Sequence, residues 1–270
     1  MPRRPPWPRA TCPRRGRPCV TSSGSQAGYR VRCEWGPAGG ALVARGADVA
    51  VVVDVLSFTT ATSVALDRGM AVIPSAVRSG SPGDGAQRSS TQRDGVVVAG
   101  RRSEGGLSLS PGSIRRVDPA PDRIVLPSPN GSTIGAALAA SASTLVAACL
   151  RNATAVGAWL AARPGATVAV VPAGERWPDG GLRPAVEDLW GAGAVVSTLL
   201  AAGAGGLSPE ARAAAAAFAA VRADLRAELR ACVSGRELID DGFADDVEVA
   251  AELDASDVVP VLVGGEFRAG

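Results

Sequence analysis

The segment VAVVVDVLSFTTATSVALDRG, residues 49–69, carries the clearest folding signal in the chain. Its apolar run Val49–Val55 is interrupted only by Asp54, a pattern typical of a strand buried on both faces of a sheet. Apolar residues then recur at spacings of three and four, which predicts a helix over Ser57–Arg68 that ends at Gly69. A strand followed directly by a helix is the repeating unit of α/β proteins.

The same alternation continues along the chain and indicates an α/β fold. We expect further strands at 72–74, 96–99, 123–126, 144–149, 167–171 and 258–263. We expect further helices at 132–142, 152–162, 184–202, from 209 onward and around 224–232. Residues 36–48 are predicted to be a Gly- and Ala-rich lead-in, and the polar residues 75–95 a loop.

The N-terminal region differs from the rest of the chain in charge and composition. Residues 1–34 contain eight arginines and one acid, whereas the remaining residues contain 20 arginines and 25 acids. Proline, glycine, serine and arginine dominate this region, so few apolar groups offset the entropy cost of ordering it. We predict a disordered extension over 1–35 and one α/β domain over 36–270, and we expect residues 1–28 to be dispensable. Nucleic-acid binding by the extension is not favoured, because aromatic interleaving and zinc-finger spacing are missing.

Two residue types are missing altogether, because the chain has no histidine and all 28 of its basic residues are arginine. Ser-His-Asp and Cys-His catalysis, Schiff-base chemistry and the lysine-containing phosphate loop are therefore excluded. The five cysteines are scattered without the spacing of a zinc site, which fits a reduced, cytoplasmic protein. No apolar run approaches the ~20 residues of a membrane helix, so we expect no membrane span.

Three carboxylates lie where α/β sheets normally bind ligands. Asp54 lies at the carboxyl end of the buried strand, and Glu187 and Asp188 lie in the first turn of the helix predicted over 184–202. We predict that Asp54, Glu187 and Asp188 are catalytic and metal-binding residues. Two alternatives stay open, because Asp54 could merely cap the next helix and the helix dipole alone favours acids at 187 and 188. Adjacent helical residues point about 100° apart, so at most one of the two would usually face the same ligand as Asp54.

Polar loops after other strands supply candidates for binding an anionic substrate. The turn Ser128–Thr133 can expose backbone amides to a phosphate, although an ordinary capped turn has the same pattern. Arginines in loops can clamp a doubly charged ligand, although most exposed arginines are only solvated. The candidates from these loops and from the hydroxyl-rich helix start after Asp54 are Thr59, Thr60, Arg101, Asn130, Ser132, Glu175, Arg176 and Arg183.

Five short segments occur in an order that is more specific than any one of them. They are VVVDVLSFTT (51–60), PNGS (129–132), LRNA (150–153), PAGER (172–176) and EDLWGAG (187–193). Taken together, they resemble the 2-phosphosulfolactate phosphatase (ComB) family of coenzyme M biosynthesis. The resemblance spans about residues 41–263 and leaves the N-terminal extension uncovered.

This resemblance implies a Mg²⁺-dependent phosphatase with a three-layer α/β/α fold around a largely parallel or mixed sheet. Such an enzyme removes phosphate from a sulfonated hydroxyacid to leave sulfolactate. It would use Asp54 and one or both of Glu187 and Asp188 as metal or acid–base carboxylates. It would use Asn130, Ser132 and Asn152 as ligand contacts. A magnesium ion held by carboxylates and substrate phosphate needs no histidine, so the implied chemistry is compatible with the composition.

The sequence departs from the family pattern at two places where substrate anions would be held. Ser57 replaces the arginine of the expected DVLRA, and Gly100-Arg101-Arg102 lacks the acid of the expected GER segment. The reaction type therefore carries over better than the substrate, and a non-catalytic phospho-ligand-binding protein on the same fold is the alternative hypothesis. Haloacid dehalogenase-like phosphatases are disfavoured because Leu56 occupies the position of their second acid. A homo-oligomer is compatible with all of these features.

Overall fold

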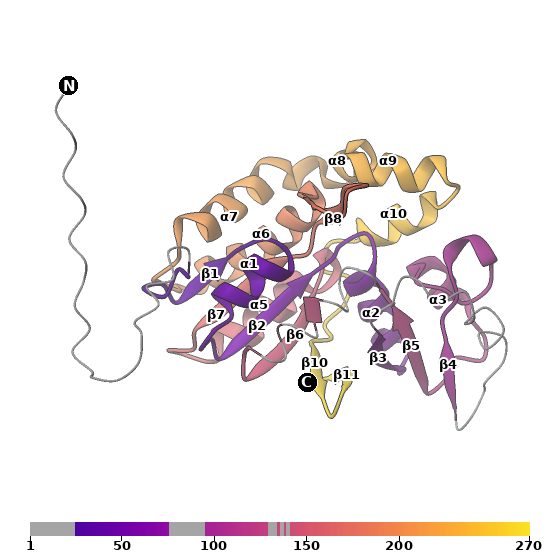
Figure 1. Cartoon of the computed structure of the whole chain (residues 1–270), viewed down its shortest axis with the longest axis horizontal. Helices are drawn as coiled ribbons and strands as arrows, with labels where there is room; N and C mark the ends of the chain where they lie inside the picture. The colour runs from indigo at the N-terminus through magenta and orange to yellow at the C-terminus, as the bar shows by residue number, and fades with distance from the viewer. Residues whose placement is uncertain (1–24, 76–94, 129–133, 136–137, 139–140) are drawn as a thin grey trace.

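The computed structural model describes residues 25–75, 95–128, 134, 135, 138 and 141–270. Within these residues, nine strands form one sheet in the order β1-β7-β2-β6-β10-β11-β3-β5-β4. Figure 1 shows the sheet with its helices. The sheet is mixed but mostly parallel, and helices pack on both of its faces. The predicted fold class, a three-layer α/β/α arrangement, is therefore confirmed.

One half of the sheet consists of four parallel strands. In spatial order they are β1 (Val31–Cys33), β7 (Val168–Pro172), β2 (Val49–Val53) and β6 (Thr144–Ala148). Val51 of β2 lies opposite Val146 on one side and Val170 on the other, and all three are fully buried. The β-branched run therefore forms a central strand, and Asp54 follows it directly.

The other half contains three parallel strands, and a hairpin joins the two halves. The three strands are β3 (Ala71–Ser75), β5 (Arg123–Pro127) and β4 (Val96–Val98). The hairpin consists of β10 (Pro260–Val263) and β11 (Glu266–Ala269), with β10 antiparallel to β6 and β11 antiparallel to β3. Gly264 and Gly265 have φ angles of 60° and 89°, the positive values that a two-residue hairpin turn requires.

Two hydrophobic cores lie on opposite faces of the sheet, because alternate side chains of a strand point in opposite directions. In β2, Val49, Val51 and Val53 enter one core, and Ala50 and Val52 enter the other. The first core includes α5 (Ala153–Ala161), α6 (Val186–Ala201), α7 (Pro209–Val221) and α8 (Leu225–Ala231). The second includes α1 (Gly36–Val43), α2 (Phe58–Asp67) and α3 (Pro111–Arg116).

The C-terminal helices and a small hairpin complete the described elements. The helices are α9 (Val233–Asp240) and α10 (Ala244–Ala250), and the hairpin pairs β8 (Glu175–Arg176) with β9 (Leu182–Arg183). Figure 1 shows α9 and α10 next to α8, on the side of the molecule where β8 lies. None of the helices in the described ranges combines the length and the apolar character that crossing a membrane requires.

The structure corrects the predicted start of the domain. Strand β1 pairs with β7 inside the predicted extension over 1–35, and helix α1 forms within the predicted lead-in over 36–48. The Gln26 side chain holds this region to the sheet, since its Nε2 donates to the Cys33 carbonyl (2.7 Å) and its Oε1 accepts from the Cys33 amide (3.0 Å). The boundary predicted after residue 35 is therefore too late. The predicted helix over 132–142 and loop over 75–95 lie mostly outside the described residues.

Candidate active site

Asp54 lies in the sharp turn between β2 and α2. The Thr59 hydroxyl donates to the Asp54 carbonyl (2.7 Å) and accepts from the Asp54 amide (2.9 Å), and the Thr60 hydroxyl donates to the Val55 carbonyl (2.5 Å). Both threonines are fully buried, so their hydroxyls fold the turn that presents Asp54. Their predicted substrate contacts stay a prediction. Ser57, rather than Asp54, occupies the N-cap position of α2.

Asp188 ties the ends of two neighbouring strands together. It lies in the first turn of α6, and its Oδ1 accepts from the Val55 amide (2.7 Å) while its Oδ2 accepts from the Gly174 amide (2.8 Å). Val55 follows β2 and Gly174 follows β7, so one carboxylate fixes both loops at the carboxyl ends of these parallel strands. This is the edge at which open α/β sheets bind ligands.

The three predicted carboxylates influence one another electrostatically. Asp54, Glu187 and Asp188 are all buried, with exposed fractions of 5%, 2% and 3%. Burial raises the pKa of Asp188 well above its usual range, and the charges of Asp54 and Glu187 raise it further. The two backbone amides that donate to Asp188 oppose this effect. The structure therefore brings the predicted acids into one cluster, in which the charges of Asp54 and Glu187 disfavour the ionised form of Asp188.

Glu187 and Asp188 have different partners, as their adjacent positions on a helix predict. Whereas Asp188 binds the strand ends, Glu187 lies close enough to Cys232, the residue at the N-cap of α9, for its charge to act on the thiol. The thiol itself donates to the Leu229 carbonyl (3.2 Å). Burial and the Glu187 charge raise the pKa of Cys232 to about 12, so this thiol stays protonated at neutral pH. The sequence offered no signal for this contact, because Cys232 has no ligand-like spacing to other residues.

The acid cluster has the donor chemistry of a magnesium site but not of a metal cage. Among the described residues, no group of three or more His, Cys, Asp or Glu is arranged to hold one ion. Mg²⁺ is usually bound by only one or two carboxylates, with waters and substrate phosphates completing its shell. Both Asp188 oxygens already accept backbone amides, so Asp54 and Glu187 are the better-placed carboxylates for such a site.

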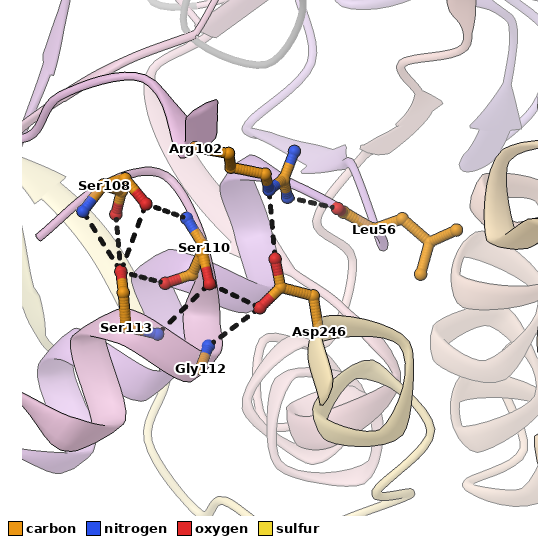
Figure 2. Close-up of polar contacts among 7 residues, drawn as sticks. All are labelled: Leu56, Arg102, Ser108, Ser110, Gly112, Ser113 and Asp246. Carbon is orange, nitrogen blue, oxygen red and sulfur yellow. Dashed lines mark hydrogen bonds and ion pairs between the residues drawn. The ribbon is translucent and has the colours of Figure 1, made fainter. Parts of the chain in front are cut away.

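An arginine approaches the turn after Asp54 from a distant segment. Arg102 Nη2 donates to the Leu56 carbonyl (2.9 Å), and its Nε donates to Asp246 Oδ2 (3.0 Å), as Figure 2 shows. The predicted Arg101 is exposed instead, and its backbone amide donates to Glu104 Oε2 (3.1 Å). The predicted substrate contact of Arg101 stays a prediction, whereas the side chain that turns toward Leu56 and Asp246 is that of its neighbour, Arg102. Two arginines in sequence give no signal for which one turns inward.

Asn152 ends the 3₁₀ helix Leu150–Asn152 that follows β6, and its side chain connects two parts of the backbone. Its Oδ1 accepts from the Cys149 amide (2.8 Å), and its Nδ2 donates to the carbonyl of Val258 (3.2 Å). The residue is fully buried, and both ends of its amide are used inside the protein. Its predicted ligand contact stays a prediction, as do those of Asn130 and Ser132, which lie outside the described residues.

The hairpin β8–β9 carries three further predicted residues. Arg183 donates twice to Glu237 of α9 (2.9 and 2.8 Å), and its guanidinium lies 5.8 Å from the centre of the Trp177 ring. The hydrogen bonds with Glu237 raise the pKa of Arg183, and the charges of Glu175 and Glu187 add to the shift. Glu175 is partly buried and Arg176 is exposed. Arg183 thus joins the hairpin to α9 next to the acid cluster.

A pocket of about 210 Å³ lies beside Gly174, the residue that donates to Asp188. Its walls are mostly apolar, and the hairpin contributes both polar and apolar groups. The residues that line it include Trp35, Ile134, Gly174, Glu175, Arg176 and Leu182. None of the three acids lines this pocket, so it meets the acid cluster only through Gly174, whose amide donates to Asp188.

Comparison with known proteins identifies similar sequences. The family model described as 2-phosphosulpholactate phosphatase matches residues 42–265. A curated relative from Deinococcus radiodurans, named "Probable 2-phosphosulfolactate phosphatase", is 31% identical over 234 residues. That match covers 81% of this chain and 89% of the relative. The region matched by the family begins in α1, ends in the β10–β11 turn and includes all three acids of the cluster.

Proposed function

The chain belongs to the 2-phosphosulfolactate phosphatase family, and from this premise we propose that it hydrolyses 2-phosphosulfolactate or a closely similar phosphorylated hydroxyacid with the help of Mg²⁺. Membership of the family makes the protein a phosphatase, a phosphoric monoester hydrolase. The products would be phosphate and sulfolactate, and we propose that the reaction serves coenzyme M biosynthesis in the cytoplasm.

The observation that supports this proposal best is the buried acid cluster at the carboxyl ends of β2 and β7. Asp188 locks the two strand ends, which fixes the position of Asp54 relative to α6. Three acids in a buried site repel one another, and a cation relieves that repulsion. A phosphorylated sulfonic acid is itself strongly anionic, so its binding here would require such a cation.

The residues of the chain can then be given distinct tasks. Asp54 and Glu187 would hold Mg²⁺, which would offset charge on the phosphoryl group when bound. Asp54, in the turn between β2 and α2, would orient the attacking water and accept its proton on a carboxylate oxygen. Asp188 would keep the two loops in place through its bonds to Val55 and Gly174. The pocket beside Gly174 would receive the organic part of the substrate.

The test is phosphate release by the purified full-length protein from 2-phosphosulfolactate and from a panel of simple phosphate monoesters. We expect turnover of 2-phosphosulfolactate that EDTA abolishes and that added Mg²⁺ restores. Undiminished turnover in EDTA would remove the metal from the mechanism. Calorimetric binding of the substrate without any phosphate release would instead favour the non-catalytic phospho-ligand-binding alternative.

A further inference from the structure

We infer that Arg102 is the arginine that binds the substrate's phosphoryl group, and that Asp246 and Ser110 are positioning residues that hold it there. This inference rests on the proposed function, because it assigns a role within the same site. The inference depends on two contacts of the Arg102 guanidinium. One is with the buried carboxylate of Asp246, and the other is with the Leu56 carbonyl in the turn that follows Asp54.

The carboxylate of Asp246 is a fixed anchor. It lies in the first turn of α10, and the residue is only 2% exposed. Its Oδ1 accepts from the Ser110 hydroxyl (2.5 Å) and the Gly112 amide (3.1 Å), and its Oδ2 accepts from Arg102 Nε (3.0 Å). Figure 2 shows the three donors converging on this one side chain. A buried carboxylate with its oxygens bonded in this way has little freedom to turn.

The position of Ser110 is fixed as well. Its hydroxyl caps α3 by accepting from the Ser113 amide (3.1 Å) while it donates to Asp246. Ser113 in turn donates from its own hydroxyl to the Ser110 carbonyl (2.8 Å). The network in Figure 2 therefore links the start of α3, the start of α10 and the 3₁₀ helix Arg102–Glu104. Segments far apart in sequence thus fix the orientation of the Arg102 guanidinium.

Arg102 keeps hydrogen-bonding capacity for a ligand. Its Nε binds Asp246 and one N–H of Nη2 binds the Leu56 carbonyl, whereas Nη1 has no hydrogen-bond partner among the described residues. The side chain is 20% exposed, so a solute can reach it. Arg32 offers a contrast, because it is only 7% exposed and all three of its guanidinium nitrogens donate to backbone carbonyls. Arg32 is a structural arginine, whereas Arg102 is held in one orientation and still has N–H groups that can donate to a ligand.

The place at which Arg102 docks determines the expected ligand. Leu56 lies two residues after Asp54, in the turn that carries the acid. The chain has Ser57 rather than an arginine in that turn, so Arg102 supplies a guanidinium there from another segment. A guanidinium at the turn that carries Asp54 fits a tetrahedral oxyanion, because its planar N–H groups match two oxygens of a phosphate. Since Asp54 would act at the phosphoryl group, the same group is the one that Arg102 would bind.

Calorimetric titration of full-length protein with inorganic phosphate in the presence of Mg²⁺ tests this inference without any turnover. Arg102→Gln combined with Asp246→Asn removes both charges together, so neither is left buried alone. We expect the double variant to bind phosphate about 10–100-fold more weakly than wild type, the scale of a lost charge-assisted hydrogen bond. Arg222→Gln removes an exposed arginine in the 3₁₀ helix after α7, outside the site, and is the control, with an expected phosphate Kd within about twofold of wild type.

The two single variants test whether Asp246 acts through Arg102. If it does, Asp246→Asn weakens phosphate binding in the wild-type background but adds no further loss in the Arg102→Gln background. A purely structural Asp246 would give additive losses. Melting temperatures of all variants separate loss of binding from loss of folded protein.

Three results would overturn the inference. They are no measurable phosphate binding by wild type, equal binding by wild type and the double variant, or an Arg102-dependent affinity for methanesulfonate without one for phosphate. Failure of the proposed function would look different. In that case phosphate would still bind in an Arg102-dependent manner, while 2-phosphosulfolactate would not be hydrolysed.

Discussion

At the scale of single residues, the position of Asp54 is set by the turn around it. Thr59 bonds both the amide and the carbonyl of Asp54, and Asp188 bonds the amide of the next residue, Val55. The backbone on both sides of the carboxylate is thus fixed by hydrogen bonds that do not use the carboxylate itself. Replacing the Asp54 side chain should therefore change the chemistry of the site more than its architecture.

Asp54→Asn is expected to lower turnover by a factor of roughly 10² or more, the usual scale for losing an acid–base or electrostatic contributor. Its melting temperature should stay close to that of wild type or rise slightly, because one of three mutually repelling acids loses its charge. Phosphate release and thermal unfolding measured on the same preparation check both expectations. Near-wild-type turnover would end the case for Asp54 as a catalytic or metal-binding group.

The acid cluster also predicts a pH dependence of stability. Burial and the charges of Asp54 and Glu187 raise the pKa of Asp188. A carboxyl group with a raised pKa in the folded state adds stability below its ordinary pKa of about 4, and that stability is lost as the pH rises through the raised value. Asp54→Asn removes one cause of the shift, so the variant should gain stability relative to wild type as the pH rises from 4 to 8. Urea unfolding of both proteins in EDTA measures this, and parallel curves would contradict it.

The sequence reveals some of these residues and hides others for physical reasons. Asp54 is predictable because a strand end before a helix start is a local pattern. The bond between Asp188 and Val55 joins residues 133 positions apart, and the ion pair of Arg102 with Asp246 joins residues 144 apart. Such contacts depend on how the elements pack, so periodicity and spacing do not report them. The same limit means that the sequence does not distinguish the surroundings of Arg101 from those of Arg102.

At the scale of elements, the loop from β7 to the β8–β9 hairpin depends on Gly174. This residue has a φ of +68°, and a Cβ added to it would lie 2.7 Å from Leu182 Cδ1 and 2.9 Å from the Arg183 carbonyl oxygen. Its amide also donates to Asp188. A side chain at this position would therefore push the hairpin away from α6 and pull the amide off the carboxylate.

Gly174→Ala is expected to destabilise the fold by about 1–3 kcal/mol and to lower turnover, because it adds backbone strain and a steric conflict. Gly180→Ala is the matched control in the same hairpin, since Gly180 has a φ of +84° but its added Cβ would meet nothing within 4 Å. Turnover and urea unfolding of the two variants separate the effect of backbone strain, which both share, from the effect of the steric conflict, which only Gly174→Ala creates. Equal effects on turnover would show that the Gly174–Asp188 bond does not matter for activity.

Element prediction succeeds where local pattern and packing agree. The β2–α2 pair follows from an apolar run and a helical spacing, and it forms as predicted. Helix α1 is missed because GPAGGALV, with three glycines, has low helix propensity. The fold explains the glycine at position 40, where a Cβ would lie 2.6 Å from Val171 Cγ1 of β7. Close packing against the sheet, rather than propensity, selects the residue there.

At the scale of the whole molecule, strand β1 lies at an edge of the sheet and is held both by residues just before it and by distant segments of the chain. Strand β1 pairs with β7, and the Ser208 amide at the start of α7 donates to the Val31 carbonyl (2.8 Å). Gln26 adds two hydrogen bonds to Cys33, and the Arg32 guanidinium donates to the Tyr29 carbonyl (3.0 Å). The domain therefore includes residues that composition alone assigns to the basic extension.

This arrangement changes the expected outcome of truncation. Deleting residues 1–28 removes Gln26 and both of its hydrogen bonds to Cys33, so we expect the melting temperature to fall by about 4–8 °C, at roughly 1 kcal/mol for each bond. Deleting residues 1–24 keeps Gln26 and should leave the melting temperature and turnover near those of the full chain. Gln26→Ala in the full chain is the control that separates the side chain from the rest of the segment. Thermal unfolding of these three proteins decides the domain boundary. A similar loss of melting temperature in both truncations would mean that residues before 25 stabilise the fold. No loss in either truncation would mean that the contacts of Gln26 do not hold β1 in place.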